Sequence, residues 1–265
     1  MILKLTESVK PPSWTKVLLE GRALYELGAL YLSVPWLWRA PYGDGHPVLV
    51  LPGFTAGDGS TLPMRTFLKS RGYAVHGWTL GVNLGQDIDP AAGGPSERLQ
   101  HRLRNLHLQY NRKVSLIGWS LGGLYARELA RIMPEDVRMV ITLASPFYET
   151  TKASRLVTLY EFLNRTNAED ISPTLRARMQ ASPPVPTTSI YSRTDGVADW
   201  RSCVEPAGEL SENIEVEASH MGLGFHPLAL WAIADRLAQE EGEWRPFQRD
   251  GFRRILYREP VEVSH

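Results

Sequence analysis

The chain has 265 residues, with 29 lysines and arginines, 29 aspartates and glutamates, and a single cysteine, Cys203. A formal charge of zero gives no support to nucleic acid or an anionic membrane as the main partner, and it favours an uncharged small-molecule substrate. One cysteine excludes an internal disulfide and a cysteine-rich zinc site, and the polar residues 1–10 lack the apolar run of a secretory signal peptide. The sequence therefore predicts one cytoplasmic domain over residues 1–265.

Residues 1–45 are predicted to form a helical extension at the N-terminus. The stretch Leu24–Trp38 is apolar apart from one glutamate and one serine. It is too short to span a bilayer comfortably, and Pro35 interrupts it. The stretch is either a helix packed on the domain or an interfacial element whose Trp36 and Trp38 sit at the headgroup level of a membrane. The packed helix is favoured, and peripheral membrane or lipid contact through this stretch stays open.

From residue 47 onward, apolar runs of strand length alternate with helical patterns. Strands are expected at 47–51, 73–78, 113–117, 137–143, 185–192 and 213–217, and helices at 62–70, 97–110 and 121–133. A long loop is expected over 81–94. The alternation predicts an α/β fold with a mainly parallel central sheet and helices on both faces.

The alternation of strands and helices is interrupted between residues 147 and 184, where no strand pattern occurs and helical patterns lie at 154–163 and 174–179. Long connections in compact domains tend to be functional, and loops at the carboxyl ends of parallel strands surround the binding crevice. We therefore interpret residues 147–184 as a short lid.

The motif Gly118-Trp119-Ser120-Leu121-Gly122 joins the predicted strand 113–117 to the predicted helix that follows. This is the context that a G-x-S-x-G motif requires, because the serine sits on a strained strand-to-helix turn and the glycines let strand and helix pass closely. The helix N-terminus also offers free N–H groups where an oxyanion would form. Ser120 is therefore the predicted nucleophile.

A serine hydroxyl needs a histidine to take its proton. The chain has seven histidines, and His220 lies in the loop just after the last predicted strand. His226 directly precedes a proline at the start of an apolar helix, where a capping or packing role is expected. His220 is therefore the predicted base.

The histidine in turn needs an acid that orients it. Asp195 follows the strand predicted to end near Tyr191, so it shares the carboxyl edge of the sheet with Ser120 and His220. Asp199 and Glu205 are rivals that lie further past the strand end. Asp195 is preferred over both because it lies nearest the strand end. The alternative for Asp195 itself is an ordinary Asp-Gly turn residue, and the chain order of serine, acid and histidine favours the catalytic role.

Two backbone N–H groups are needed to stabilise the oxyanion of a tetrahedral intermediate. Leu121, directly after the predicted nucleophile, supplies one of them. The other is expected from the loop after the first predicted strand, where Pro52-Gly53 permits a tight reversal. The predicted donors are therefore the N–H groups of Leu121 and Phe54.

Taken together, these residues resemble the α/β-hydrolase superfamily, and more closely its lipase and esterase-like members. The resemblance covers residues 46–237 and rests on four blocks in order, at 51–54, 116–123, 192–197 and 219–222. It implies an α/β-hydrolase fold and an esterase mechanism with Ser120, Asp195 and His220 as the triad. One departure is Pro52-Gly53, where many members have a His-Gly pair at the first oxyanion position.

The predicted activity is hydrolysis of carboxylic esters through an acyl-enzyme. Trp119, Phe147 and Leu223 are expected to line a substrate pocket for an uncharged acyl chain. A thioesterase or amidase would use the same triad, and a binding protein that keeps the fold without activity is a rival of another class. No metal, organic cofactor or nucleic-acid partner is expected, and the oligomeric state is left open.

Overall fold

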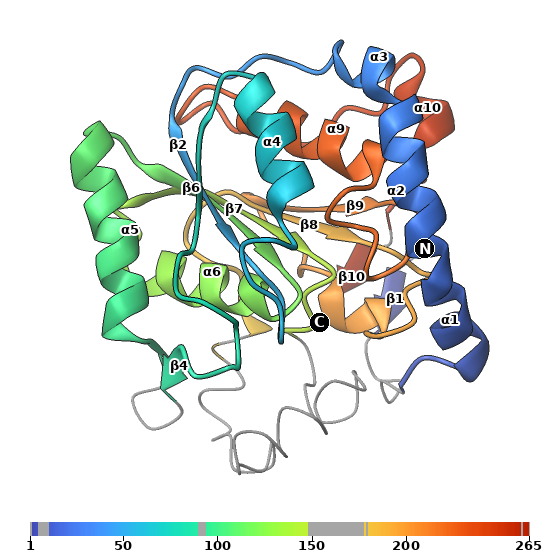
Figure 1. Cartoon of the computed structure of the whole chain (residues 1–265), viewed down its shortest axis with the longest axis horizontal. Coiled ribbons are helices and arrows are strands. Elements are labelled where there is room, and N and C mark those ends of the chain that lie inside the picture. The colour runs from blue at the N-terminus through green and yellow to red at the C-terminus, as the bar shows by residue number, and fades with distance from the viewer. Residues whose placement is uncertain are drawn as a thin grey trace.

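The computed structural model describes residues 2–4, 11–89, 94–147, 178, 180–260 and 262–264. Within them the central sheet consists of β2 (Pro47–Leu51), β3 (Ala74–Gly77), β6 (Val114–Trp119), β7 (Val137–Leu143), β8 (Thr187–Tyr191) and β9 (Ser211–Glu215). Their spatial order is β3-β2-β6-β7-β8-β9, and every neighbouring pair is parallel (Figure 1). The predicted α/β fold is confirmed.

Helices cover both faces of this sheet. The helices α4 (Leu62–Ser70) and α9 (Pro227–Leu237) lie on one face, and α5 (Glu97–Tyr110) and α6 (Leu121–Ile132) lie on the other (Figure 1). Successive residues of β2 point to opposite faces: Val48 and Val50 pack with α4 and α9, whereas Leu49 and Leu51 pack with α5 and α6. Two apolar cores therefore enclose the sheet, as a buried parallel sheet requires.

The N-terminal helices run along one side of the sheet. They are α1 (Trp14–Leu19), the short 3₁₀ helix η1 (Glu20–Arg22), α2 (Ala23–Leu32) and α3 (Val34–Leu37) (Figure 1). Trp36 of α3 stacks on Trp231 of α9 with 6.1 Å between ring centroids, and Leu30 and Leu37 are buried in the same core. Pro35 lies in the first turn of α3, so the break between α2 and α3 occurs where the sequence predicts it.

Further short elements lie outside the central sheet. They are β1 (Ile2–Lys4), which pairs in parallel with β10 (Glu262–Ser264), the 3₁₀ helix η3 (Trp200–Cys203) and α10 (Arg253–Leu256). No helix among the described residues is long and apolar enough to cross a membrane. The grouping of the whole chain into one domain with an extension over residues 1–45 stays a prediction.

Some element bounds differ from those expected. The strand β9 begins at Ser211 instead of residue 213, because the polar Ser211 and Glu212 pair with Thr187 and Thr188 at the edge of the sheet, where burial does not demand apolar side chains. The predicted loop 81–94 contains a short antiparallel pair, β4 (Ile88–Asp89) and β5 (Gly94–Pro95). Of the predicted lid, residues 148–177 and 179 lie outside the described residues.

Candidate active site

Ser120 occupies the sharp turn between β6 and α6. Its backbone has φ 54° and ψ −120°, a conformation that costs a non-glycine residue about 1–3 kcal/mol. A Cβ on Gly118 would collide with the backbone of Gly122, and a Cβ on Gly122 would collide with the backbone at Leu51. The glycines of the motif are therefore required for this turn, which holds Ser120 at the N-terminus of α6.

The predicted acid and base are in direct contact. The Nδ1–H of His220 donates to Oδ2 of Asp195 over 2.7 Å, and both residues are almost completely buried. The other carboxylate oxygen, Oδ1, accepts the N–H groups of Val197 at 2.7 Å and Ala198 at 2.8 Å. These bonds fix the carboxylate and leave the Nε2 atom of His220 to accept a proton.

The charges around His220 favour its protonated form. Burial lowers the pKa of the imidazole. The carboxylates of Asp195 and, from η1, Glu20 raise this pKa by more than burial lowers it, so the pKa of His220 lies above the ordinary value of 6.5. The buried imidazolium that forms during proton transfer is therefore stabilised.

His220 also lies against the end of β6. The indole N–H of Trp119 donates to the backbone carbonyl of His220 over 3.1 Å. The hydroxyl of Ser192, just after β8, donates to the carbonyl of Ala218 over 2.6 Å and so joins the loops that follow β8 and β9. Among the described residues no hydrogen bond joins the Ser120 hydroxyl to His220, a contact that often tightens only when substrate binds.

The rival residues have other partners. Asp199 caps η3 by accepting the N–H of Arg201 over 2.9 Å, and the buried carboxylate of Glu205 pairs with Arg127. His226 caps α9 through Nδ1, which accepts the N–H of Leu228 over 3.3 Å, as the sequence predicts. Within the described part of the chain no hydrogen bond or ion pair joins any of these three residues to Asp195 or His220.

A second serine, histidine and aspartate lie in line elsewhere in the fold, and sequence reasoning missed them. His46 Nδ1 donates to Asp44 over 2.5 Å, and its Nε2 lies 2.8 Å from the hydroxyl of Ser115. Ser115 and His46 are fully buried, and Ser115 lies near the start of β6, away from the carboxyl edge of the sheet. Substrate has no route to this serine, so the trio is structural.

The two predicted oxyanion donors flank Ser120. Leu121 is the first residue of α6, so no carbonyl within the helix can accept its N–H. The loop after β2 lies beside Ser120, because a Cβ on Gly53 would be 3.3 Å from the Cβ of Ser120. The use of Leu121 and Phe54 as donors stays a prediction.

A buried asparagine, missed by the sequence reasoning, holds the loop after β2. The side-chain amide of Asn83 donates to the carbonyl of Pro52 over 2.8 Å, and its oxygen accepts the hydroxyl of Tyr125 at 3.0 Å. Asn83 is fully buried. It lies in the glycine-rich stretch after β3, which offered no local signal for this role.

The three predicted pocket residues are buried side chains. Trp119 packs against Gly224, Phe147 lies 3.7 Å beneath the guanidinium of Arg127, and Leu223 belongs to the core beside α9. Their part in substrate binding stays a prediction. The described residues include no group of three or more histidine, cysteine, aspartate or glutamate side chains that could hold a metal ion.

Comparison with known families agrees with this architecture. The model of the alpha/beta hydrolase family matches residues 34–262, which include all three candidate triad residues. The chain belongs to the alpha/beta hydrolase family. No curated protein matches the sequence.

Solved structures similar to this alpha/beta hydrolase share its fold at low identity. Lipase B of Aspergillus fumigatus is 18% identical with a TM-score of 0.58 over 77% of this chain, which spans only 56% of that lipase. The mature lipase BlEst2 of Bacillus licheniformis is 15% identical with a TM-score of 0.55, over 76% of this chain and 95% of its own. The hydrolase MGS-MChE2, from a metagenome of lagoon sediments at Mar Chica, Morocco, is 16% identical with a TM-score of 0.50, over 73% and 90%.

Proposed function

We propose that this alpha/beta hydrolase cleaves carboxylic esters through an acyl-enzyme on Ser120. The observation that carries the proposal is the 2.7 Å bond from His220 to the carboxylate of Asp195, in a fold that also holds Ser120 at the N-terminus of α6. A carboxylate in this position fixes the histidine tautomer and stabilises the imidazolium.

In the proposed reaction Oγ of Ser120 attacks the ester carbonyl carbon, and Nε2 of His220 takes the hydroxyl proton. The oxyanion faces the N–H groups of Leu121 and Phe54. The carbon–oxygen bond to the alcohol then breaks, and the alcohol leaves with the proton from His220. A water that His220 deprotonates attacks the acyl-enzyme and releases the carboxylic acid and free Ser120.

The substrate is proposed to have an uncharged acyl chain. The residues directly before and after Ser120 are the apolar Trp119 and Leu121, and two of the similar folds are lipases by name. Thioesters and amides would pass through the same steps, so one series of acyl chains presented as nitrophenyl esters, thioesters and anilides separates the classes. The proposal expects the highest kcat/KM with the oxygen esters, and a preference for the anilides or thioesters would contradict it.

The nucleophile is tested by comparing Ser120→Ala with Ser115→Ala. The first variant should lose about 10³-fold or more of kcat, because only positioning and the oxyanion donors are left. The second removes the serine of the buried trio and should keep its activity. Turnover like the wild type in Ser120→Ala would refute the proposal, and a wild type inactive on the whole series would favour a binding protein that keeps the fold without activity.

A further inference from the structure

The N-terminal helices have an unusual distribution of charge. Between Trp14 and Trp38 the chain has four charged residues, and all of them point inward: Lys16, Glu20, Arg22 and Glu26. Each contacts at least one of the two loops that contain Asp195 and His220. The charged side of these helices therefore faces the candidate active site.

Three of these side chains each hold one loop. The ammonium of Lys16 donates to the carbonyl of Arg193 over 2.6 Å. The guanidinium of Arg22 donates to the hydroxyl of Thr194 over 2.6 Å. On the other loop, Glu26 accepts the N–H of Ser219 over 2.8 Å and also the Ser219 hydroxyl.

Glu20 joins the two loops to each other. Its Oε1 accepts the N–H of Gly196 over 2.8 Å and the N–H of His220 over 2.9 Å, and its Oε2 accepts the N–H of Met221 over 3.0 Å. Gly196 directly follows the triad acid, and a Cβ there would collide with the carbonyl of Lys16. One carboxylate thus binds the backbone beside the acid and the backbone of the histidine itself.

We propose that Glu20 is a positioning residue that sets the distance between Asp195 and His220. This inference rests on the proposed function. Loops have no ladder of hydrogen bonds to fix their relative position, and hydrogen bonds to a carboxylate are about twice as strong as those between neutral groups. Misplacing a catalytic group by about 1 Å can cost about 10²-fold in rate. Glu20 acts through His220 and does not touch the reacting atoms.

The charge of Glu20 has a second consequence for His220. The groups facing His220 are Asp195 after β8, Glu20 from η1, and, one residue away at Ser219, the ion pair of Glu26 with Arg22 at 3.2 Å. Glu20 raises the pKa of His220. Neutralising Glu20 should therefore shift the acid limb of the pH–rate profile to lower pH, which a purely structural effect would not do.

The test compares Glu20→Ala and Glu20→Gln in the full chain, with Glu217→Gln as the matched control. Glu217 is an exposed carboxylate three residues before His220 and pairs with Arg258 over 2.7 Å. We expect kcat of Glu20→Ala to fall about 10- to 100-fold with little change in KM. Glu20→Gln keeps one acceptor oxygen, so its loss should be smaller and its acid limb should move to lower pH. The control should match the wild type.

A proton NMR readout keeps the inference independent of the substrate. The Nδ1–H of His220, bonded to Asp195, gives a far-downfield signal that should shift or broaden in Glu20→Ala and persist in Glu217→Gln. Unchanged kcat, pH profile and NMR signal in both Glu20 variants would overturn the inference. A wild type without esterase activity but with a signal sensitive to Glu20 would contradict only the proposed function. If Glu20→Ala does not fold, the nearly isosteric Glu20→Gln decides by its pH profile and signal.

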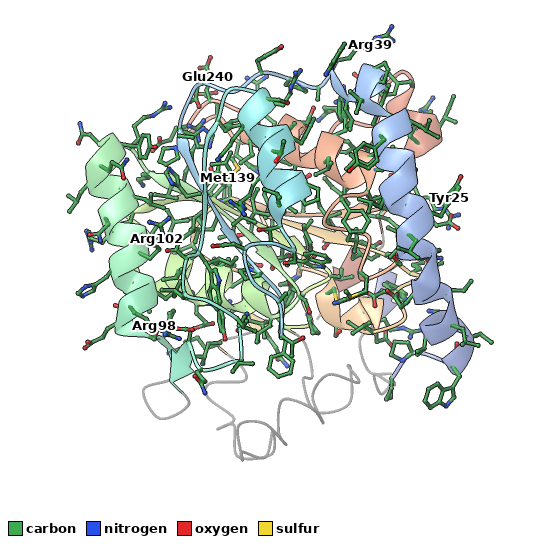
Figure 2. The ribbon with its side chains drawn as sticks, in the orientation of Figure 1. Tyr25, Arg39, Arg98, Arg102, Met139 and Glu240 are labelled. Atoms are coloured by element: carbon green, nitrogen blue, oxygen red, sulfur yellow. The ribbon has the colours of Figure 1, made fainter. Side chains whose placement is uncertain are left out.

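The opposite side of the same helices supports a second, independent inference. The side chains that point outward are apolar and largely exposed: Trp14, Leu18, Leu24, Tyr25, Leu32 and Trp38. Leu24 is 81% exposed and Leu32 is 86% exposed. Tyr25 and Arg39 point away from the body of the protein (Figure 2). A surface helix normally places its polar residues outward and its apolar residues inward. These N-terminal helices show the reverse arrangement, with charged residues inward and apolar residues outward.

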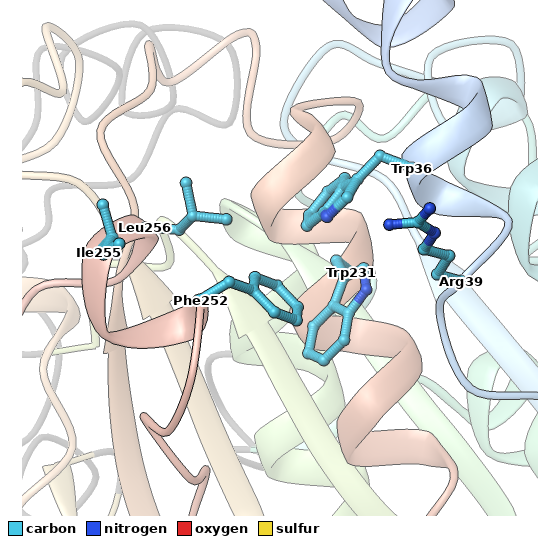
Figure 3. A pocket seen from close by; sticks show the side chains of 6 residues that line it. All are labelled: Trp36, Arg39, Trp231, Phe252, Ile255 and Leu256. Atoms are coloured by element: carbon cyan, nitrogen blue, oxygen red, sulfur yellow. The ribbon is translucent and has the colours of Figure 1, made fainter.

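An apolar pocket lies next to this surface. It has a volume of about 380 Å³ between α3, α9 and α10, and it is lined by Trp36, Arg39, Trp231, Phe252, Ile255 and Leu256 (Figure 3). Ile255 is 87% exposed. The pocket combines an apolar floor with one cationic side chain, Arg39, a composition that suits the boundary between lipid tails and phosphates.

We infer that the outer side of α1–α3 and the pocket beside it rest on the surface of a phospholipid bilayer. Exposed tryptophans stand at both ends of the helical stretch, as in interfacial segments, and both glutamates between them face inward. The exposed cations at the edge of this surface are Arg39 and, on α10, Arg254, which complement lipid phosphates, and the exposed carboxylate of Asp250 nearby is paired with Arg253. The exposed apolar side chains and the neighbouring arginines are therefore better accommodated at a lipid surface than in water.

Sedimentation of the full chain with phosphatidylcholine vesicles, with and without phosphatidylglycerol, tests this inference. A variant with Leu24→Ser, Tyr25→Ser and Leu32→Ser should lose most of the binding. Leu108→Ser, on α5 at the far side of the molecule, removes a leucine that is 66% exposed and should bind like the wild type (Figure 1). Absence of vesicle binding, or equal binding by both variants, would overturn the inference. Self-association that the triple variant abolishes, without vesicle binding, would assign the surface to a second copy instead.

Discussion

Replacing Asp195 by asparagine is the change whose effect follows most directly from the observed hydrogen bonds. Three donors converge on the two carboxylate oxygens: two backbone N–H groups on Oδ1 and the His220 Nδ1–H on Oδ2. An asparagine has only one acceptor oxygen, and it is expected to face the two N–H groups. Its NH₂ group then faces His220, which must turn its Nδ1 into an acceptor and place its proton on Nε2.

His220 with its proton on Nε2 cannot take the proton of Ser120, so we expect kcat to fall about 10⁴-fold. The fold should survive, because only one buried hydrogen bond is exchanged, at a cost of about 1–3 kcal/mol. Steady-state kinetics with a nitrophenyl ester and a thermal unfolding curve measure the two quantities. The matched control is Asp199→Asn, which weakens the cap of η3 and removes the ion pair with Arg201. If Asp195→Asn kept its activity within tenfold, or Asp199→Asn were as damaging, the reasoning would be refuted.

Three further outcomes are expected. The kcat/KM should rise with pH through a pKa above 6.5, because His220 must be neutral and its pKa is raised; a midpoint below pH 6 would contradict this. Asn83→Ala should lower kcat about 10- to 100-fold at nearly constant KM, since the loop that contains Phe54 loses the side-chain hydrogen bond at Pro52 and keeps only its backbone bonds to residue 83. An unchanged kcat would argue against this loop as the second oxyanion donor. Burial and Arg138 lower the pKa of His46 to about 4, so between pH 6.5 and 4 the unfolded chain takes up a proton that the native protein does not, and the free energy of unfolding should fall by about 3 kcal/mol over that range. Denaturant unfolding of His46→Gln should lack this contribution. If the free energy of unfolding of His46→Gln fell with pH as steeply as that of the wild type, the contribution of His46 would be excluded.

Local sequence patterns predicted much of the fold. The runs at β2 and β7 are continuously apolar because both faces of the sheet are buried, and their bounds agree with the predicted 47–51 and 137–143. Helix α5 begins after its serine cap at the predicted residue. At β9 the pattern fails, because an edge strand tolerates the polar Ser211 and Glu212 and so lacks the apolar run.

The contact between Asp195 and His220 was predictable because the carboxyl ends of parallel strands meet at one edge of the sheet. The contacts of Glu20 were not. Glu20 and His220 are 200 residues apart, and nothing near either residue signals the other. Glu26 looked like a polar exception in an apolar stretch, yet it is buried against Ser219. Such pairings depend on how a terminal helix docks, which periodicity does not encode.

The central claim is that Ser120 is an activated nucleophile, and covalent labelling tests it most directly. The native protein is treated with a fluorophosphonate, digested, and mapped by mass spectrometry. We expect one rapid adduct, on the peptide that contains Ser120, and a much slower reaction in Asp195→Asn, because the serine oxygen is activated only through His220. No adduct, or an adduct on another serine that forms equally fast in both proteins, would contradict the claim.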